Sequence, residues 1–344
     1  MSDPAYVIRA AGPADFAAFQ ALRTEAGPGF TSLMLDDSAL KTRLEQNAAG
    51  FAAKSDKPGK ERFLLALEHI ASGDVAGCCA VKATIGEAPP FYNFHILRIA
   101  QSSAAAQRRF DMSVLILVNE FTGCSEVGSL FVRKAHRAAG IGRALAQSRY
   151  LLMASAPHRF RERVVSELRG VVDANGASPF WEALGRHFFQ MDFSEADRLS
   201  ATTDNQFILD LMPKYPIYVD LLPESARAVI GECHADGAGA RRLLEWEGFT
   251  FSDVVDIFDG GPLLSAPRDS IRTARESKRL KLEVGAGGAP QRRALIAVPD
   301  IATYRAISTH ASIADGKALV SREALAALKL EAGAEALVWC GDEI

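Results

Sequence analysis

Apolar residues near the start of the chain fall into short blocks that alternate with polar, helix-forming stretches. The blocks at residues 6–9, 63–68 and 75–84 predict strands, whereas the spacing after Pro13 and over residues 37–53 predicts helices. Proline suits the first turn of a helix because its missing N–H would have no partner there. The chain therefore begins as a strand followed by helices and a pair of strands.

The rest of the chain continues this mixture. Further strands are predicted at residues 114–118, 127–132, 164–172, 249–258, 294–298 and 336–340, and helices at 179–189, 224–230, 239–247, 270–278 and 321–328. The segment Asp259-Gly260-Gly261-Pro262 is rich in turn residues and is the best candidate for a boundary. We therefore expect a main region over residues 1–262 and an accessory region over 263–344 that contains a small subdomain with strands.

A glycine-containing turn lies between the predicted strand at 127–132 and a helix-forming stretch that runs to about residue 154. The turn contains Arg137, Gly140 and Gly142, so the backbone N–H groups of residues 138–143 can converge at the start of the helix. Unpaired N–H groups and the helix dipole make such a turn a plausible seat for a pyrophosphate. The alternative is an ordinary basic helix start whose glycines serve only packing.

Composition and charge narrow the class of protein. The 344 residues include 39 basic and 42 acidic side chains, and the formal net charge of -3 gives no overall attraction to nucleic acid or to an anionic membrane. The 5 cysteines show no Cys-x-x-Cys pair and no histidine spacing suited to zinc, which favours a reducing compartment and predicts no metal. Neither a signal peptide nor a long apolar segment is found, so we expect a cytoplasmic protein.

The turn resembles the Arg/Gln-x-x-Gly-x-Gly/Ala pattern of the GNAT superfamily of acyl-CoA N-acyltransferases, in spacing and in its strand–turn–helix context. This resemblance implies an α+β, GNAT-like fold with a largely antiparallel sheet, and the alternative that two diverged GNAT-like halves share it. It also implies that coenzyme A is the ligand. The residues that would bind it are Arg137, Ala138, Gly140, Ile141, Gly142 and Arg143.

Other segments resemble the arginine N-succinyltransferase family, and the likeness runs to about Arg275. They are residues 29–33, 91–93, 122–126, 167–170, 178–182, 184–189, 211–218, 228–231, 247–249 and 255–262. The resemblance implies transfer of a succinyl group from succinyl-CoA to the α-amine of L-arginine, as part of arginine degradation. It places the family's proton-donor histidine at His234 and a succinyl-CoA-binding leucine at Leu130.

The chemistry implied requires proton transfer and charge recognition. An amine must lose a proton to attack a thioester, and the leaving thiolate must gain one, which suits a histidine such as His234. The acyl donor is a substrate, so no permanently bound cofactor is expected. Carboxylate groups of the substrates need cations, for which the candidates are Arg98, Arg169, Arg186 and Lys214. Candidates that could face the guanidinium of arginine are Glu126, Glu167, Asp256 and Asp259.

Two departures from the family and several alternatives stay open. Ile141 stands where family members often carry asparagine, and the chain after Lys278 matches weakly. A nucleophilic role for Cys124 is disfavoured because no histidine and aspartate or asparagine arrangement is recognisable around it. The acceptor could be ornithine or another amino acid, or the chain could be a non-catalytic acyl-CoA-binding subunit. As partners we expect a homo-oligomer or a homologous subunit.

Overall fold

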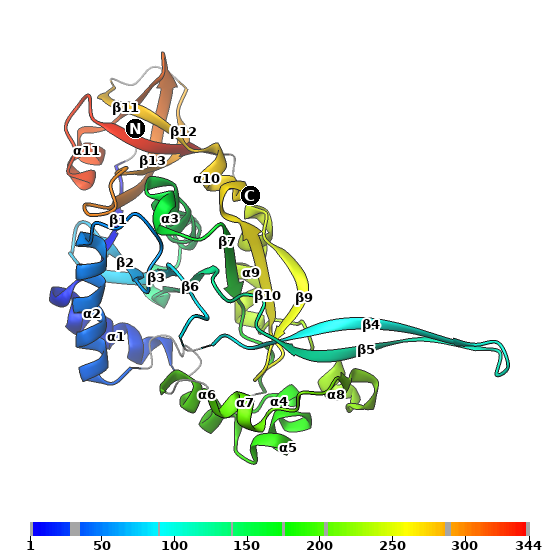
Figure 1. Cartoon of the computed structure of the whole chain (residues 1–344). Coiled ribbons are helices and arrows are strands. Elements are labelled where there is room, and N and C mark those ends of the chain that lie inside the picture. The colour runs from blue at the N-terminus through cyan, green and yellow to red at the C-terminus, as the bar shows by residue number, and fades with distance from the viewer. Residues whose placement is uncertain are drawn as a thin grey trace. The chain divides into compact units, whose positions relative to one another are not determined.

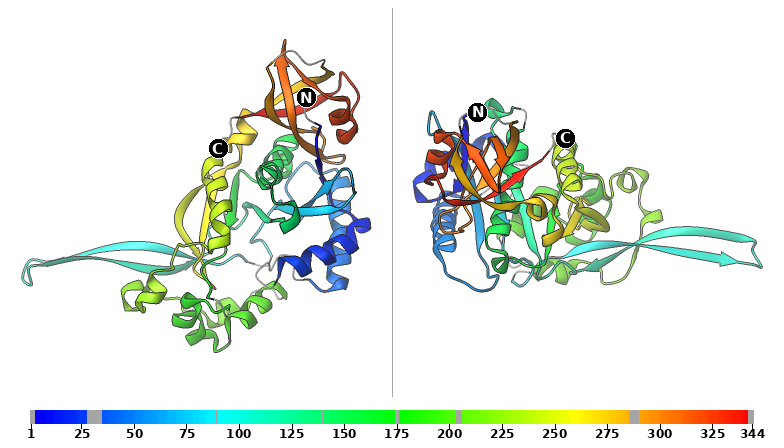
Figure 2. Two further views of the ribbon diagram at one scale, coloured as in Figure 1. Left: turned by 180° about the vertical axis from the view of Figure 1, so that it is seen from behind. Right: turned by 90° about the horizontal axis from the view of Figure 1, so that it is seen from above.

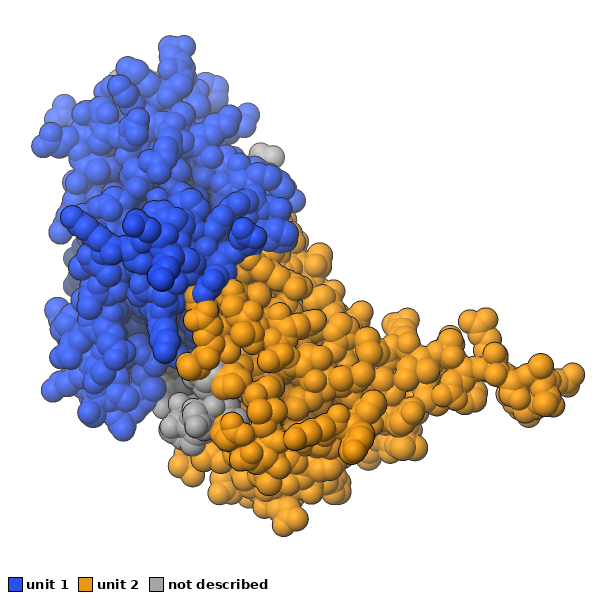
Figure 3. Space-filling view, viewed as in Figure 1, with its two compact units in different colours: residues 1–83, 127–162, 267–344 blue, residues 84–126, 163–266 orange. Residues whose placement is uncertain are grey.

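The structure is a computed structural model that describes residues 3–27, 35–88, 90–138, 140–173, 176–202, 206–285 and 290–341. It divides into two compact units, each formed by several stretches of chain (Figure 3). Unit 1 comprises residues 1–83, 127–162 and 267–344, and unit 2 comprises residues 84–126 and 163–266. The family-like segment at residues 29–33 lies outside the described residues.

The first part of unit 1 is an antiparallel sheet covered by two helices. Strands β1, β2 and β3 lie next to one another in that order, and β6 follows β3. Apolar residues of the helices, such as Phe19 and Leu44, pack against Leu64 and Ala66 of β2 in one buried cluster. The bounds are β1 Tyr6–Ala10, α1 Phe16–Ala26, α2 Asp37–Ala52, β2 Arg62–His69, β3 Val75–Lys82 and β6 Ser125–Val132.

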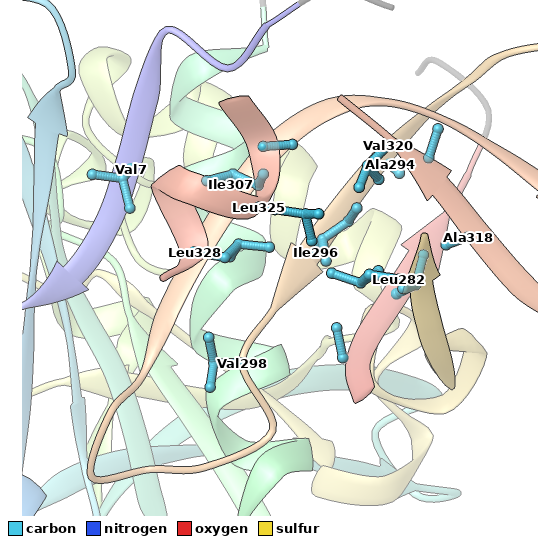
Figure 4. Packing of buried hydrophobic residues seen from close by; sticks show 14 residues of the cluster. Val7, Leu282, Ala294, Ile296, Val298, Ile307, Ala318, Val320, Leu325 and Leu328 are labelled. Atoms are coloured by element: carbon cyan, nitrogen blue, oxygen red, sulfur yellow. The ribbon is translucent and has the colours of Figure 1, made fainter. Parts of the chain in front are cut away.

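The last part of unit 1 is a closed ring of strands, which is a small β-barrel. Strands β12, β15, β11, β14 and β13 are neighbours in that order, and β12 also pairs with β13. Leu282, Ile296 and Ile307 fill the interior, and Leu325 and Leu328 of α11 point into the same cluster (Figure 4). The bounds are β11 Lys278–Val284, β12 Arg292–Ala297, β13 Arg305–Ala314, β14 Lys317–Val320, α11 Arg322–Leu328 and β15 Glu335–Cys340.

The ring belongs to unit 1 because its strand β13 pairs with β1. Val7 of β1 lies opposite Ile307, and both side chains are part of the buried cluster of the ring. Helix α3 (Ile141–Ser155) is tied to the same region, since Tyr304 donates a hydrogen bond to the carbonyl of Ser148. This arrangement differs from the expected division into residues 1–262 and 263–344, because the C-terminal strands share a core with the N-terminal strand.

Unit 2 is built on a second set of mostly antiparallel strands. Strands β7, β10, β9, β4, β5 and β8 are neighbours in that order, and Trp181 stacks on Phe189 and Phe258 in the adjoining core. The strand bounds are β4 Asn93–Ser103, β5 Arg108–Val118, β7 Arg163–Glu167, β8 Ile217–Tyr218, β9 Thr250–Asp256 and β10 Pro262–Pro267. The helix bounds are α4 Pro179–Ala183, α5 Gly185–Phe189, α6 Phe193–Thr202, α7 Gln206–Leu211, α8 Glu224–Arg227 and α9 Ala238–Glu247.

Strands β4 and β5 form a long two-stranded hairpin (Figures 1 and 2). Strand β4 pairs with β9 only at residues 93–95, and β5 pairs with β8 at Val114 and Leu115. Beyond those positions the two strands pair with each other, from Arg98 with Ser113 to Ser103 with Arg108. Only residues 114–118 were predicted as strand here, because the outer part of the hairpin carries many polar residues.

The expectation of an α+β protein with a largely antiparallel sheet is confirmed, since antiparallel pairs predominate among the described strands, alongside parallel pairs of β6 with β7 and of β11 with β14. The expected boundary at residues 259–262 is instead the turn of an antiparallel hairpin, because Pro262 of β10 lies opposite Val255 of β9. The predicted helix at 179–189 is broken at Leu184, and the predicted helix at 270–278 is the shorter α10 (Arg272–Glu276). No helix among the described residues is long and apolar enough to cross a membrane.

Candidate active site

The turn between β6 and α3 has the geometry of an anion site. Gly140 is the residue before the first helical turn and has a left-handed backbone with φ 82°, a conformation that favours glycine. The N–H of Ile141 reaches the carbonyl of Ala138 at 3.2 Å, and that of Ala144 begins the helical ladder on Gly140 at 2.9 Å. The N–H of Gly142 has no partner inside the helix and lies at its positive end.

Unit 1 holds the chain entering this turn at several points. The carboxylate of Glu25 on α1 binds the Nε of Arg133 at 2.7 Å and the backbone N–H of Lys134 at 2.8 Å. The hydroxyl of Tyr6 lies 3.1 Å from the Nδ1 of His136. Arg133 holds the pKa of Glu25 below its usual range, so this carboxylate is charged at neutral pH. The turn is therefore fixed from both α1 and β1.

The predicted donor-binding residues of the turn differ in exposure. Arg137 and Ala138 are exposed, whereas Gly140, Ile141, Gly142 and Arg143 are half-buried. The Nε of Arg137 donates to the carbonyl of Val132 at 2.9 Å, which folds this side chain back along the strand. The guanidinium of Arg143 lies 5.3 Å from the centre of the Trp339 ring. The structure thus brings the six predicted residues together at one helix start.

Leu130 lies on β6 in the same unit and is half-buried. The preceding residue, Ser129, has φ 53° in the middle of the strand, a conformation that is uncommon for a residue with a side chain. This backbone conformation changes the direction of the strand locally, as a β-bulge does. Backbone strain at this position, directly before a predicted substrate-binding residue, agrees with the common placement of strain at functional sites.

His234 lies in unit 2, on a short segment that begins after Gly231. Its backbone N–H binds the carbonyl of Arg169 at 2.8 Å, and Cys233 forms an isolated bridge with Gly170. The Nδ1 of the imidazole accepts a hydrogen bond from the N–H of Asp236 at 3.2 Å. The neutral ring therefore carries its proton on Nε2. With 26% of its side chain exposed, His234 remains accessible to a substrate.

Two buried aspartates, Asp256 and Asp259, fix the backbone next to Arg169, to which His234 is hydrogen-bonded. Asp259 accepts hydrogen bonds from the N–H of Gly261 at 2.8 Å and of Gly170 at 2.7 Å. Asp256 accepts from the N–H groups of Phe258 and Asp259 at 2.7 and 2.9 Å. Burial raises the pKa of both carboxyl groups, and the nearby charges of Glu167 and Asp259 raise that of Asp256 further. These side chains stabilise the turn from 256 to 261, and their burial disfavours contact with a substrate guanidinium.

The remaining charged candidates fall into two groups. Glu167 and Arg169 lie beside the aspartate pair and the His234 segment, at the exposed end of β7. Arg186 pairs with Glu182 at 2.9 Å and Asp192 at 3.1 Å, while Arg98 lies on the hairpin and Lys214 is exposed between α7 and β8. Glu126 lies on β6 next to the parallel strand β7. Cys124 is buried with Phe121 and Val165.

Sequence reasoning did not identify the residues that support these positions. Glu25 and Tyr6 hold the turn from α1 and β1, and Arg293 of β12 donates to the carbonyl of Gly140 at 2.9 Å. No local motif marks them, because each is brought to the turn by pairing between distant parts of unit 1. Among the residues described here, no group of three histidine, cysteine or acidic side chains is arranged to hold a metal ion.

Comparison with known proteins gives a consistent assignment. The family described as arginine N-succinyltransferase beta subunit matches residues 6–273. The arginine N-succinyltransferase of Salmonella typhi is 38% identical over 328 residues, which make up 95% of this chain and 95% of that protein. The chain belongs to the arginine N-succinyltransferase family. The protein of the same name from Salmonella newport shows the same identity and coverage.

A solved structure supports this family membership at the level of the fold. Subunit AI of the arginine/ornithine succinyltransferase from Pseudomonas aeruginosa matches with a TM-score of 0.88 and 33% identity, over 98% of this chain and 99% of that chain. The family match ends at residue 273, but the structural match continues beyond it. The ring of strands in this arginine N-succinyltransferase family member therefore has a counterpart in a solved relative.

We predict that Asp259→Asn destabilises the protein by about 1–3 kcal/mol, because asparagine has one acceptor oxygen and leaves the N–H of Gly170 or Gly261 unpaired. Asp256→Asn is the matched control, since one oxygen suffices for its two bonds.

The raised pKa of Asp256 predicts a pH dependence of stability. Because the folded pKa of Asp256 is raised, its contribution to stability falls as pH rises above the ordinary carboxyl pKa, and Asp256→Asn should reduce this fall. Urea unfolding at pH 5 and pH 8 measures both effects, and equal losses in the two variants would contradict the prediction.

Proposed function

We propose that the chain transfers a succinyl group from succinyl-CoA to the α-amine of L-arginine, giving N2-succinyl-L-arginine and CoA, as a step of arginine catabolism in the cytoplasm. The observation that carries the proposal is the strand–turn–helix element with a left-handed Gly140, in a chain of the arginine N-succinyltransferase family. This element supports binding of a nucleotide-linked acyl donor. The family supports arginine as the acceptor.

The donor site that we propose is the helix start formed by Arg137, Ala138 and residues 140–143. Backbone N–H groups and the positive end of α3 would bind the pyrophosphate of succinyl-CoA. Ile141 in place of asparagine leaves this function intact, because the main chain supplies the donors. Leu130, on the strand that leads into the turn, would contact the pantetheine arm. We further propose that β6, the turn and α3 are the acyl-CoA-binding element of a GNAT-like fold; two diverged GNAT-like halves stay a prediction.

The reaction that we propose is direct attack of the amine on the thioester, without an enzyme-bound acyl group. The amine loses a proton, the oxyanion of the tetrahedral intermediate needs hydrogen-bond donors, and the CoA thiolate gains a proton as it leaves. His234 would supply the proton from Nε2 in its charged, doubly protonated form, because a neutral ring that gave up this proton would become an anion. When the ring is charged, the Asp236 carboxylate at 3.6 Å from Nδ1 can take over as acceptor. Succinyl-CoA is a substrate in this scheme, and no resident cofactor is required.

For the acceptor, Arg169 and Glu167 are the candidates that the geometry favours. Both are exposed and lie next to the segment that carries His234. Arg169 would bind a carboxylate, and Glu167 would face the guanidinium of arginine. Asp256 and Asp259 are less suited to this role, because both carboxyl groups are buried and accept hydrogen bonds from the backbone. Ornithine is the second candidate acceptor, because the similar Pseudomonas protein is named for arginine and ornithine together.

We propose that the chain works in an oligomer with a second copy of itself or with a homologous subunit. The similar Pseudomonas chain is named a subunit, and the β4–β5 hairpin offers an apolar face. The register places Ile99 opposite Met112 and Gln101 opposite Phe110, so Leu97, Ile99, Phe110 and Met112 share one face. Leu97 is 41% and Phe110 49% exposed. A two-stranded hairpin is marginally stable alone in water, which favours a partner that covers this face.

The first test is acceptor-dependent release of CoA. The purified chain with succinyl-CoA should release free thiol only when an amino acid is added, and the initial rate should be highest with L-arginine, lower with ornithine and lowest with lysine. A thiol assay measures the rate, and mass spectrometry identifies the product. CoA binding without release in any of these mixtures would favour a non-catalytic acyl-CoA-binding subunit instead.

The second test concerns the proton donor. His234→Ala should lower kcat by about 100-fold or more, with little change in KM for succinyl-CoA, because proton transfer by a positioned side chain contributes on the order of 10²–10⁴. His187→Ala is the control, since His187 is an exposed histidine of the same unit. Near-normal turnover in His234→Ala would remove this residue from the mechanism.

The third test concerns assembly. The double variant Phe110→Ser with Met112→Ser should lower the molar mass measured by light scattering, because it removes apolar surface from the shared face of the hairpin. Asp111→Ser is the control, since Asp111 lies between these residues on the same strand and faces the other side. An unchanged mass in the double variant, or a monomeric parent protein, would overturn the proposed hairpin interface.

A further inference from the structure

The closed ring of strands places a cation directly against the donor turn. Arg293 lies on β12, and one of its terminal nitrogens donates to the carbonyl of Gly140 at 2.9 Å. Its Nε donates to the hydroxyl of Ser308 on β13 at 3.3 Å. Gly140 and the ring all belong to unit 1, so this contact lies within one compact body.

The packing of Arg293 on Gly140 is close. A Cβ atom added to Gly140 would lie 2.1–2.5 Å from the guanidinium atoms of Arg293. The guanidinium therefore lies against the bare backbone of the glycine, at the residue where the chain turns into α3. Glycine is required at position 140 for two reasons: its backbone φ is 82°, and Arg293 occupies the space that a side chain would fill.

The charge of Arg293 is not balanced inside the protein. The side chain is half-buried, and within the described parts of the chain no carboxylate lies at ion-pair distance from it. Its two bonds go to uncharged oxygens and use two of the five N–H donors of a guanidinium. A partly desolvated charge is stabilised by a counter-charge, so the remaining donors favour an anion.

The surroundings add to the positive potential. Helix α3 begins at the next residue, Ile141, and the guanidinium of Arg143 lies over the Trp339 ring of β15. Two acids that contact the turn or Trp339 already have partners. Glu25 binds Arg133 and Lys134, and Glu276 binds Arg275 and the indole N–H of Trp339. An anion at the turn would meet donors from both the helix start and the ring.

We propose that Arg293 is a phosphate-binding residue of the acyl-CoA site, which fixes Gly140 through one bond and presents its remaining donors to a phosphate group of CoA. The inference rests on the proposed function for the identity of the ligand. It assigns the C-terminal ring a direct part in donor binding. The planar fork of arginine suits two oxygens of one phosphate, which lysine cannot match in the same geometry.

Binding of CoA itself tests the proposal without turnover. Arg293→Met should weaken CoA binding by roughly 10-fold or more in calorimetry, because a charge-assisted hydrogen bond contributes about 1.5–3 kcal/mol. Arg292→Met is the matched control. It removes the same charge from the neighbouring, exposed position of β12, whose side chain points to the other face. The control should leave affinity nearly unchanged, and equal losses in both variants would overturn a specific contact.

A second variant separates phosphate binding from support of the turn. Arg293→Gln keeps an N–H donor for the carbonyl of Gly140 but has no charge. If Arg293 binds phosphate, Arg293→Gln should bind CoA as weakly as Arg293→Met, and both should show a smaller salt dependence than the parent protein. Recovery of affinity in Arg293→Gln would show that Arg293 only positions the turn, and would overturn the proposal.

The phosphate concerned is identified with dephospho-CoA, which lacks the 3′-phosphate. An equal loss for CoA and dephospho-CoA in Arg293→Met assigns the contact to the pyrophosphate, and a loss for CoA alone assigns it to the 3′-phosphate. Failure of the proposed function is distinguishable, because a parent protein that binds CoA without succinylating an amine would leave this inference standing. If Arg293→Met binds CoA as tightly as the parent protein does, this inference is wrong and the proposed function is unaffected.

Discussion

The left-handed backbone at Gly140 is the constraint on which the donor side of the molecule depends. A φ of 82° lets the chain leave β6, reverse and enter α3 within a few residues, so that N–H groups at the helix start are directed outward. The conformation is costly for any residue with a side chain, and the surrounding contacts fix it further. Glu25 holds the entry of the turn, and Arg293 holds the carbonyl of Gly140 itself.

Near the candidate acceptor residues of unit 2, buried carboxyl groups fix the backbone, as the contacts of Gly140 do at the donor turn. Two buried carboxyl groups, Asp256 and Asp259, bind the backbone N–H groups of their own turn and of Gly170. Desolvation raises their pKa values, so burial of these groups opposes the ionised form while the N–H bonds favour it. The result is a rigid backbone next to Arg169, whose carbonyl positions His234. The segment that carries His234 is thus held against a fixed support.

The local parts of this arrangement were predictable from the sequence, and the long-range parts were not. The strand, the turn and the helix around Gly140 follow from hydrophobic pattern and glycine placement, which act over a few residues. Residues 259–262 looked like a boundary because Gly-Gly-Pro marks any turn, and the strand that follows, β10, is recognisable only through its pairing with β9. The outer part of the β4–β5 hairpin was missed because Arg98, Arg109 and Asp111, on its opposite face, separate the apolar residues along the chain, so that no continuous apolar run marks the strands.

The position of Arg293 shows why site residues are harder to predict than elements. Nothing in the sequence Gln291-Arg292-Arg293-Ala294 distinguishes one arginine from the other, and only the pairing of β12 with β13, and of β13 with β1, brings the second one to the turn. The cost of holding a half-buried charge there is then part of the folding free energy of the ring. An anion bound as proposed would offset that cost, so the same contact would link donor binding to the stability of the C-terminal strands. A ring of strands that shares a core with β1 and touches Gly140 would for this reason be a component of the proposed donor site, and its separation as an accessory domain would remove the cation from the helix start.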